Sequence, residues 1–247
     1  MKYCLVIPHY NHLEALRKFL PVLSVLPYPS IVIDDGSEPS VVEQLTSVIA
    51  TYDGISLVKH NRNRGKGAAV ISGCYQARTL GYSHIIQIDA DGQHDSKDIE
   101  KFIAYSQQHP QTIISGKPVF DDSAPKARVY GRKVTDFWVA LETLSLQIKD
   151  SLCGFRLYPL AQMEMLIDRY HIGPRMDFDT DILVKAVWAD ISLHFVPTKV
   201  VYPVNGVSHF RYLSDNWRLI RLHTRLMLGM FLRTPQLLYR RISRIFR

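Results

Sequence analysis

The segment HIIQIDADGQHD, residues 84–95, places two carboxylates directly after an apolar run. Asp89 and Asp91 follow this run, and on an extended backbone side chains two residues apart point to the same side. Two carboxylates this close repel each other unless a cation stands between them. One interpretation is therefore a divalent metal bound through oxygen ligands. The other is an acidic turn, because Asp-Gly is a turn dipeptide.

A second acidic pair closes another apolar run, in IVIDDGS. Asp34 and Asp35 then stand at a strand-to-helix turn, where they either face a ligand or cap the turn. The segment NRNRGKGAAV resembles a phosphate-cradling loop without being a Walker A sequence, since Gly67 stands where Ser or Thr should follow Lys66. Its small residues permit close approach of a ligand or of a neighbouring strand, and packing explains them equally well.

Apolar strand-like runs alternate along the chain with helical patterns. Strands are expected at residues 3–8, 30–33, 55–59, 84–88 and 112–115, and helices at 12–26, 39–51, 66–80 and 96–108. This alternation predicts an α/β fold with a mostly parallel sheet and helices on both faces. Ligands of such sheets bind beyond the carboxyl ends of the strands, which is where PHYN, DDGS, NRNRGKG and DADGQ all fall. Their convergence indicates one functional site.

The chain after Ser115 is less regular. We expect a loop at residues 117–126, helices at 129–148, 160–170 and 182–189, and a strand pair within 191–203.

The composition limits the class of protein. A chain of 247 residues suits one large domain, or a domain with a short appendage. Three widely spaced cysteines without a CxxC pair favour a reducing compartment. No apolar run approaches the ~18–20 residues of a spanning helix, and the first residues are too polar for a signal peptide, so we expect a cytoplasmic protein. The net charge of +7 is concentrated, because residues 211–247 hold nine Arg and one acid, a net of +8 that leaves about −1 for the rest.

The segments VIPHYN, IDDGS, NRGKGAA and IDADGQH, in this order and spacing, resemble the family 2 glycosyltransferases of the GT-A fold. Within that family they look most like the polyprenyl-phosphate sugar synthases. The resemblance covers residues 1–210, which we take as the catalytic domain. It implies an inverting transfer from a UDP- or GDP-linked sugar to a lipid-linked or glycan acceptor, with Mg²⁺ or Mn²⁺. A leaving nucleoside diphosphate develops negative charge, which a cation stabilises more in the transition state than in the ground state.

The resemblance also implies roles on the donor side of the site. Asp35, with Asp34, would hold the nucleotide base in a pocket lined by Pro8 and Tyr10. The metal ligands would be Asp89, Asp91 and Gln93. Further nucleotide-sugar contacts would come from Asn11, Lys66, Ala90, Lys117, His209 and Arg211.

The segment DSLCGFRLY resembles the acceptor turn of this family. Gly154, Phe155 and Arg156 would then lie under the acceptor, with Arg156 as a phosphate contact and Asp150 as a polar contact to the sugar. The alternative is a core position for Phe155 and a surface position for Arg156.

The segment DFDTDIL resembles the family's Phe-acid-x-acid element. Asp179 or Asp181 would be the base that removes the proton when the acceptor is an alcohol. A phosphate acceptor is already anionic and needs no base. The alternative role for Asp179 is to cap a helix.

The basic segment 211–247 predicts two amphipathic helices separated at Pro235. Arg218, Arg221, Arg225 and Arg233 fall on one arc, and an apolar face lies opposite them. Such helices either lie on an anionic membrane surface or pack on the domain, and we expect peripheral association with the inner face of the cell membrane.

Other classes of protein explain less of the sequence. A soluble-type polyprenyl-phosphate sugar synthase is the nearest alternative. A sugar-nucleotide pyrophosphorylase should open with a Gly-rich turn, which IPHYN lacks. A basic adaptor for membrane or nucleic acid leaves the converging acids unexplained, and we expect no nucleic-acid partner.

Overall fold

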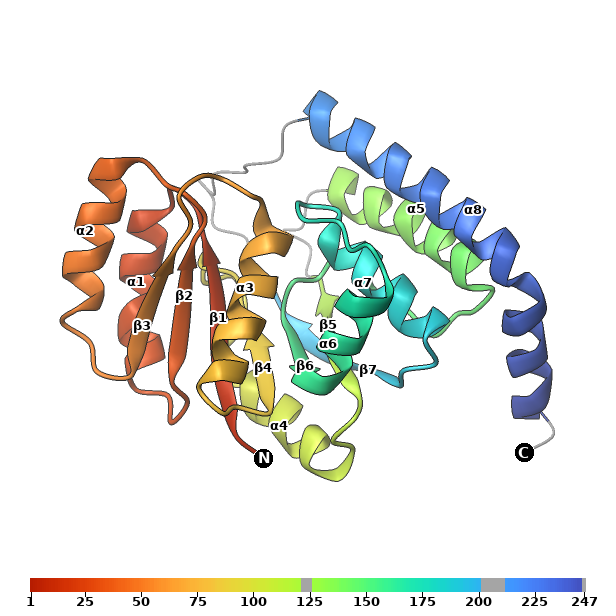
Figure 1. Ribbon diagram of the computed structural model, residues 1–247, viewed down its shortest axis with the longest axis horizontal. Coiled ribbons are helices and arrows are strands. Elements are labelled where there is room, and N and C mark those ends of the chain that lie inside the picture. Colours follow the sequence, from red (N-terminus) through yellow and green to blue (C-terminus); the bar gives the residue numbers. More distant parts are fainter. Residues whose placement is uncertain (121–125, 201–211, 246–247) are drawn as a thin grey trace.

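The structure is a computed structural model that describes residues 1–120, 126–200 and 212–245 (Figure 1). Its strands are β1 Tyr3–His9, β2 Ser30–Asp34, β3 Ile55–Lys59, β4 His84–Gln87, β5 Ile113–Val119, β6 Arg156–Pro159 and β7 Leu193–Lys199. Its helices are α1 Leu13–Ser24, α2 Pro39–Ile49, α3 Lys66–Thr79, α4 Asp98–Gln108, α5 Lys126–Thr143, α6 Leu160–Arg169, α7 Phe178–Trp188 and α8 Tyr212–Ile245.

The strands form one seven-stranded sheet in the order β3-β2-β1-β4-β6-β5-β7. The pairs β1–β2, β2–β3, β1–β4 and β5–β7 are parallel, and β6 is antiparallel to both of its neighbours. The predicted α/β fold with a mostly parallel sheet is therefore confirmed. The carboxyl ends of β1, β2 and β4 meet at one edge, which brings the predicted site segments together.

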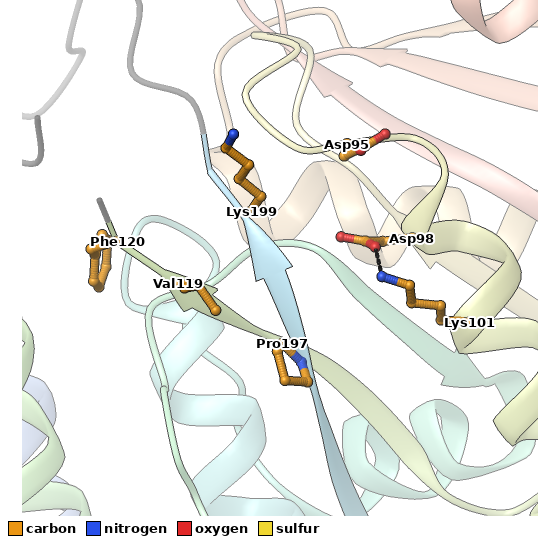
Figure 2. Close-up of a pocket in the computed structure, with 7 residues that line it drawn as sticks. All are labelled: Asp95, Asp98, Lys101, Val119, Phe120, Pro197 and Lys199. Atoms are coloured by element: carbon orange, nitrogen blue, oxygen red, sulfur yellow. Dashed lines mark hydrogen bonds and ion pairs between the residues drawn. The ribbon is translucent and has the colours of Figure 1, made fainter. Parts of the chain in front are cut away.

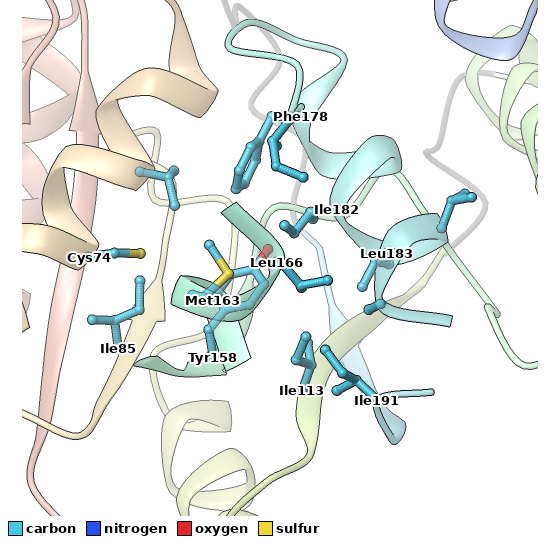
Figure 3. Close-up of a cluster of buried hydrophobic side chains, with 14 of the residues drawn as sticks. Cys74, Ile85, Ile113, Tyr158, Met163, Leu166, Phe178, Ile182, Leu183 and Ile191 are labelled. Carbon is cyan, nitrogen blue, oxygen red and sulfur yellow. The ribbon is translucent and has the colours of Figure 1, made fainter. Parts of the chain in front are cut away.

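Both faces of the sheet are buried, and β1 shows how the sequence achieves this. Cys4 and Val6 face a cluster built with α3, α6 and α7, whereas Leu5 and Ile7 face a cluster built with α1, α2 and α4. All four are fully buried, as period-two alternation in a covered strand requires. Figure 3 shows the first cluster, where Tyr158 packs among side chains from α3, α6 and α7.

Helix α3 lies unusually close to the sheet because its inner face carries small residues. A Cβ placed on Gly73 would collide with the side chain of Val6, and one on Gly67 would collide with Phe178. The small residues of NRGKGAA therefore serve packing, which is one of the two explanations that the sequence allowed.

Strand β6 was not anticipated from the sequence. It is four residues long and begins with Arg156, a residue type that argues against a central strand. Arg156 is tolerated in this strand because each nitrogen of its guanidinium donates a hydrogen bond inside the protein. Strand β5 also extends to Val119, into the expected loop. Of the strand pair expected within 191–203, β7 is seen, and the residues from 201 lie outside the described part.

The predicted break at Pro235 does not occur, because α8 is a single helix from Tyr212 to Ile245. Proline removes one helical hydrogen bond and bends the chain, and α8 changes direction in its second half (Figure 1). Contacts on both sides of the proline hold the helix on α7. Arg233 lies over the Trp188 ring at 4.5 Å, and Arg240 donates to the Trp188 carbonyl oxygen at 2.9 Å.

One face of α8 belongs to the hydrophobic core. Leu222, Leu226 and Met230 are buried and join the cluster that contains α5 and α7. Two polar contacts add to this packing: Arg225 forms an ion pair with Asp181 on α7, and His223 forms a hydrogen bond with Glu142 on α5. Within the described part of the chain, every helix is too short or too polar to cross a lipid bilayer.

We predict that Leu226→Ala lowers the free energy of unfolding by about 2–5 kcal/mol, because it leaves a cavity in a packed interface. The matched control is Leu228→Ala two residues later, where the side chain is 62% exposed. That change should stay within about 0.5 kcal/mol of the parent. Urea denaturation monitored by circular dichroism makes the comparison, and equal effects would contradict packing of α8 on the domain.

Candidate active site

The centre of the site is a lysine held between two carboxylates. The Lys66 ammonium lies 2.9 Å from Asp89 Oδ1 and 3.0 Å from Asp179 Oδ2. Burial disfavours the charged form of Lys66, but the attraction of Asp179 and Asp89 outweighs it and raises the pKa of the lysine above its ordinary value. The three side chains come from the start of α3, the end of β4 and the first turn of α7.

Two buried side chains also hold Asp179 in place through hydrogen bonds. Gln87 donates from Nε2 to Asp179 Oδ1 at 3.2 Å, and Arg156 donates from Nη1 to the Asp179 carbonyl oxygen at 2.6 Å. Both donors are fully buried. Gln87 was not singled out from the sequence, although a glutamine inside the apolar run HIIQI is a signal, because a buried amide needs polar partners.

Asp89 and Asp91 differ in electrostatic environment. Burial opposes the ionisation of Asp89, but Lys66 outweighs it with help from His94 and Arg156, so the pKa of Asp89 is lowered. Asp91 receives less compensation: burial and the nearby Asp89 charge raise its pKa to about 6. Its Oδ1 accepts a hydrogen bond from the Gln93 amide at 3.0 Å. Asp91 is thus the less compensated of the two carboxylates.

His94 lies beside this acidic pair and was not singled out from the sequence. Its ring packs on Phe155 at 5.1 Å, and burial lowers its pKa. Its buried Nδ1 has no hydrogen-bond partner among the described residues. His94 is therefore a half-buried imidazole whose pKa the Asp89 charge also influences.

The Asp34–Asp35 pair stabilises the loops around the site. The fully buried Asp34 accepts from His9 Nδ1 at 2.9 Å and from Ser37. Asp35 accepts from His60 Nδ1 at 2.8 Å and from the amide of Gly65 at 2.7 Å. The pair thereby fixes the ends of β1 and β2 and the loop that leads to Lys66. These internal partners fit the alternative of a capped turn, and contact of Asp34 and Asp35 with a nucleotide base stays a prediction.

The residues expected to line a pocket for the nucleotide base lie at the carboxyl end of β1. Pro8 is half-buried at the end of β1, and Tyr10 is 37% exposed. Asn11 adopts a positive φ of 52° and accepts from the amide of Glu38 at 2.9 Å through its side chain. Tyr10 is therefore partly accessible to solvent at the carboxyl end of β1.

Asp181 is placed differently from its expected role as a base. It is fully buried and ion-pairs with Lys185 at 2.6 Å and with Arg225 at 2.8 Å. It also accepts from the Gly173 amide. Its side chain therefore joins α7 to α8 and points away from Lys66, since α-helical residues two apart face different sides.

The expected acceptor residues are also mostly internal. Phe155 is fully buried and stacks on Phe102 at 4.5 Å, which is the core alternative for this residue. Arg156 is fully buried too, and donates to Ser115 and to the carbonyl oxygen of Ser151. It therefore has no surface from which to touch an acceptor in this conformation, and neither interpretation of the sequence anticipated a buried arginine.

Gly154 does lie at the centre of the site. A Cβ on this residue would collide with Lys66 Nζ and would lie 2.8 Å from Asp89 Oδ2. A side chain at this position would have to displace the Lys66–Asp89 pair, so glycine lets the backbone pass close to it. Ala90 is buried within the turn that carries Asp89.

Asp150 and Lys117 lie farther along the sheet. Asp150 is buried, pairs with Arg132 at 2.5 Å, and accepts from the Cys153 amide at 2.7 Å. Burial and the Asp150 charge raise the pKa of the neighbouring Asp136 to about 6, while Arg132 and Lys117 partly offset them. This Arg132-containing cluster was not predicted. His209 and Arg211 lie outside the described residues.

A hollow of about 370 Å³ opens beside this region, between α4, β5 and β7. Figure 2 shows Asp98 paired with Lys101 on one side and Lys199 and Phe120 on the other. Its walls carry mixed charge and do not include Lys66, Asp89 or Asp179. The hollow is therefore separate from the charged centre.

The described donor atoms suit a divalent cation only in part. Carboxylate oxygens are the ligands that Mg²⁺ and Mn²⁺ prefer, and the charge of Asp91 is only partly compensated within the protein. Across the described residues, however, no three His, Cys, Asp or Glu side chains are arranged to hold a metal ion between them. Any bound cation therefore needs further ligands, which a diphosphate can supply.

The fold is that of the GT-A glycosyltransferases. Glucosyl-3-phosphoglycerate synthase from Mycobacterium tuberculosis, solved with uridine diphosphate, superposes with a TM-score of 0.64 at 13% identity, over 93% of this chain and 79% of that one. TarS from S. aureus, solved with UDP-GlcNAc, gives a TM-score of 0.61 at 14% identity, over 92% of this chain and 67% of that one. At these identities the likeness concerns the fold.

The chain belongs to glycosyl transferase family 2, whose model matches residues 4–163. It is 30% identical over 202 residues to a dolichyl-phosphate beta-glucosyltransferase of Dictyostelium discoideum, covering 73% of this chain and 61% of that protein. It is 25% identical to a UDP-N-acetylglucosamine–dolichyl-phosphate N-acetylglucosaminyltransferase of Methanococcus voltae, covering 80% and 85%. The predicted family is confirmed, and these relatives agree with the polyprenyl-phosphate sugar synthase branch.

We predict that Asp91→Asn stabilises the ligand-free protein at pH 7–8 in the presence of a chelator. The folded-state pKa of about 6 exceeds the ordinary 3.8, so folding favours the protonated form. That contribution is complete below about pH 4 and is lost as the pH rises through about 6. The rise in melting temperature should therefore shrink toward zero at pH 4.

The control is Asp95→Asn, which removes one exposed charge from the same loop. Its melting temperature should follow that of the parent across the same pH range. A stabilisation by Asp91→Asn that is the same at pH 4 and pH 8 would contradict repulsion between Asp89 and Asp91.

Proposed function

We propose that the protein transfers a sugar, with inversion at the anomeric carbon, from a nucleotide-diphosphate sugar to a phosphate group carried on a polyprenyl lipid. The observation that carries this proposal is the Lys66-centred group of Asp89 and Asp179, with Asp91 beside it, at the carboxyl edge of the sheet. Family membership and the dolichyl-phosphate relatives support the reaction class and the acceptor.

A divalent cation, Mg²⁺ or Mn²⁺, fits this proposal at Asp91 and Asp89, with Gln93 adjacent. When bound, it would neutralise charge on the diphosphate leaving group. The raised pKa of Asp91 supports this assignment, because a cation would remove the repulsion that causes it. The donor base would lie near Tyr10, at the ends of β1 and β2.

The position of Asp179 favours a phosphate acceptor over an alcohol. One of its oxygens faces the Lys66 ammonium at 3.0 Å, and the other accepts from Gln87. A general base needs a free lone pair directed at the acceptor proton. An anionic phosphate attacks without losing a proton, so Asp179 has only to hold Lys66 and the surrounding backbone in place.

The lipid substrate suggests where the protein works. We propose peripheral attachment to the cytoplasmic face of the cell membrane through the basic segment 211–247. Packing on the domain and binding to a membrane are compatible for this segment. Helix α8 buries one face in the core and leaves apolar side chains exposed on the other. A membrane surface rich in anionic lipid complements its arginines.

A donor and acceptor screen tests the proposal. Purified protein is incubated with UDP- and GDP-sugars, with Mn²⁺ or Mg²⁺, and with either a short polyprenyl phosphate or the matching polyprenol. We expect transfer to the phosphate and none to the alcohol. Failure to bind any nucleoside diphosphate would contradict the proposed donor, and transfer to the alcohol alone would contradict the proposed acceptor.

We predict that Asp179→Asn acts mainly through KM when polyprenyl phosphate is the acceptor, with kcat reduced less than about tenfold. Loss of a general base would instead reduce kcat by roughly 10²–10⁴. Steady-state kinetics separates the two results, and Asp168→Asn, an exposed change on α6, serves as the control. A fall in kcat in the larger range would restore Asp179 as the base.

A further inference from the structure

Helix α5 has an exposed apolar face that the core does not use. Its outward side chains are large and repeat at helical spacing, and they are Tyr130 at 67% exposure, Val134 at 58%, Phe137 at 60%, Trp138 at 39% and Leu141 at 37%. The buried side chains of α5, such as Val139 and Glu142, point to the other side of the helix. A soluble monomer rarely exposes so many large apolar side chains together.

Helix α8 exposes a second apolar face. At 100° per residue, Trp217, Ile220 and Phe231 lie opposite the buried Leu222 and Leu226. Trp217 and Phe231 are 62% and 63% exposed. The core therefore covers one side of α8 and leaves the outer side without a partner among the described residues.

The two faces are neighbours. Helices α5 and α8 pack side by side (Figure 1), and Trp138 lies at their junction, 6.2 Å from the ring of His223 on α8 and 5.9 Å from Phe137. His223 in turn pairs with the buried Glu142 of α5. The outward aromatic side chains thus belong to one rigid two-helix surface.

Helices α5 and α8 are strongly basic, and although Arg132, Arg225 and Arg233 contact the domain, Lys133 and Arg221 are exposed beside the outward apolar side chains. Helix α5 contains four Lys or Arg and two acids, and α8 contains seven Arg and one acid, so together they carry eleven basic residues against three acidic ones. Two copies of such a surface would repel each other. Aromatic and aliphatic side chains bordered by arginine instead suit the headgroup region of an anionic bilayer.

We propose that the outer faces of α5 and α8 together form one membrane-docking surface for anionic lipid. This inference extends the proposed function, because it assigns membrane contact to α5 as well as to the C-terminal segment. Since α8 is fixed to α5 and α7, the surface does not act as a flexible tether. It sets the orientation of the whole domain, and with it the position of the site, relative to the bilayer.

Flotation with vesicles of phosphatidylcholine, with and without phosphatidylglycerol, tests the surface. Val134→Glu with Phe137→Glu on α5 should lower affinity for the anionic vesicles at least about tenfold, as should Ile220→Glu with Phe231→Glu on α8. The matched control is Val25→Glu with Leu80→Glu. It places the same charges at exposed apolar positions outside these helices and should bind like the parent.

Tryptophan fluorescence gives a second test that needs no disruptive change. Of the three tryptophans, Trp188 is buried, so Trp217→Phe leaves Trp138 as the exposed reporter on α5, and Trp138→Phe leaves Trp217 on α8. Both variants should show a blue shift on addition of anionic vesicles. A shift only in the variant that retains Trp217 would overturn the part assigned to α5.

Two further outcomes distinguish this inference from its rivals. Absence of vesicle binding by the parent protein would overturn the docking surface, and so would a dimer in light scattering that the α5 and α8 variants convert to monomer. Nucleotide binding is measured in parallel. Vesicle binding without nucleotide binding would contradict the proposed donor and leave the docking surface standing, whereas the reverse result would contradict the docking surface alone.

Discussion

The rest of the site depends on the positive charge of Lys66, which holds Asp89 and Asp179 together. Three carboxylates, Asp89, Asp91 and Asp179, meet at the carboxyl edge of the sheet, and without an internal cation their repulsion would drive these segments apart. Lys66 compensates Asp89 and Asp179, which joins the end of β4 to the start of α7. Asp91 stays undercompensated, and this residual charge is what a metal-bound diphosphate could use. The negative charge of Asp91 therefore lowers the stability of the ligand-free protein, and the same charge would favour binding of a metal-bound diphosphate.

The same interaction explains the close packing around the site. The ammonium reaches both carboxylates only if α3 lies tight against the sheet and against α7, which the glycines of this region permit. Gly67 leaves room for Phe178, and Gly154 lets the backbone pass beside Lys66. On the far side of α7, Asp181 binds Arg225 and so secures α8. A continuous set of packed helices thus connects the charged centre to the outer surface formed by α5 and α8.

The strand and helix order of the first 110 residues could be predicted, because each strand there is a mostly apolar run and each helix follows a clear turn. The acidic motifs were found for the same reason, since charged residues at strand ends stand out. Arg156 was harder: a buried arginine in a strand becomes plausible only once its partners, all distant in sequence, are in place. The roles of Asp179 and Asp181 could not be separated from the sequence, because only tertiary structure shows which one meets Lys66. The helix break expected at Pro235 does not occur, because α8 is held on the domain by contacts on both sides of the proline.

The most direct test of this account is a double-mutant cycle on the free energy of unfolding, with Lys66→Met, Asp179→Asn and the two combined. Lys66→Met alone leaves two carboxylates without their cation, and we expect a loss of about 3–5 kcal/mol. Adding Asp179→Asn removes one of those charges, so the double variant should be more stable than Lys66→Met alone, with a coupling of about 1–3 kcal/mol. Additive effects of the two changes, within about 0.5 kcal/mol, would contradict the claim that Lys66 holds these carboxylates together.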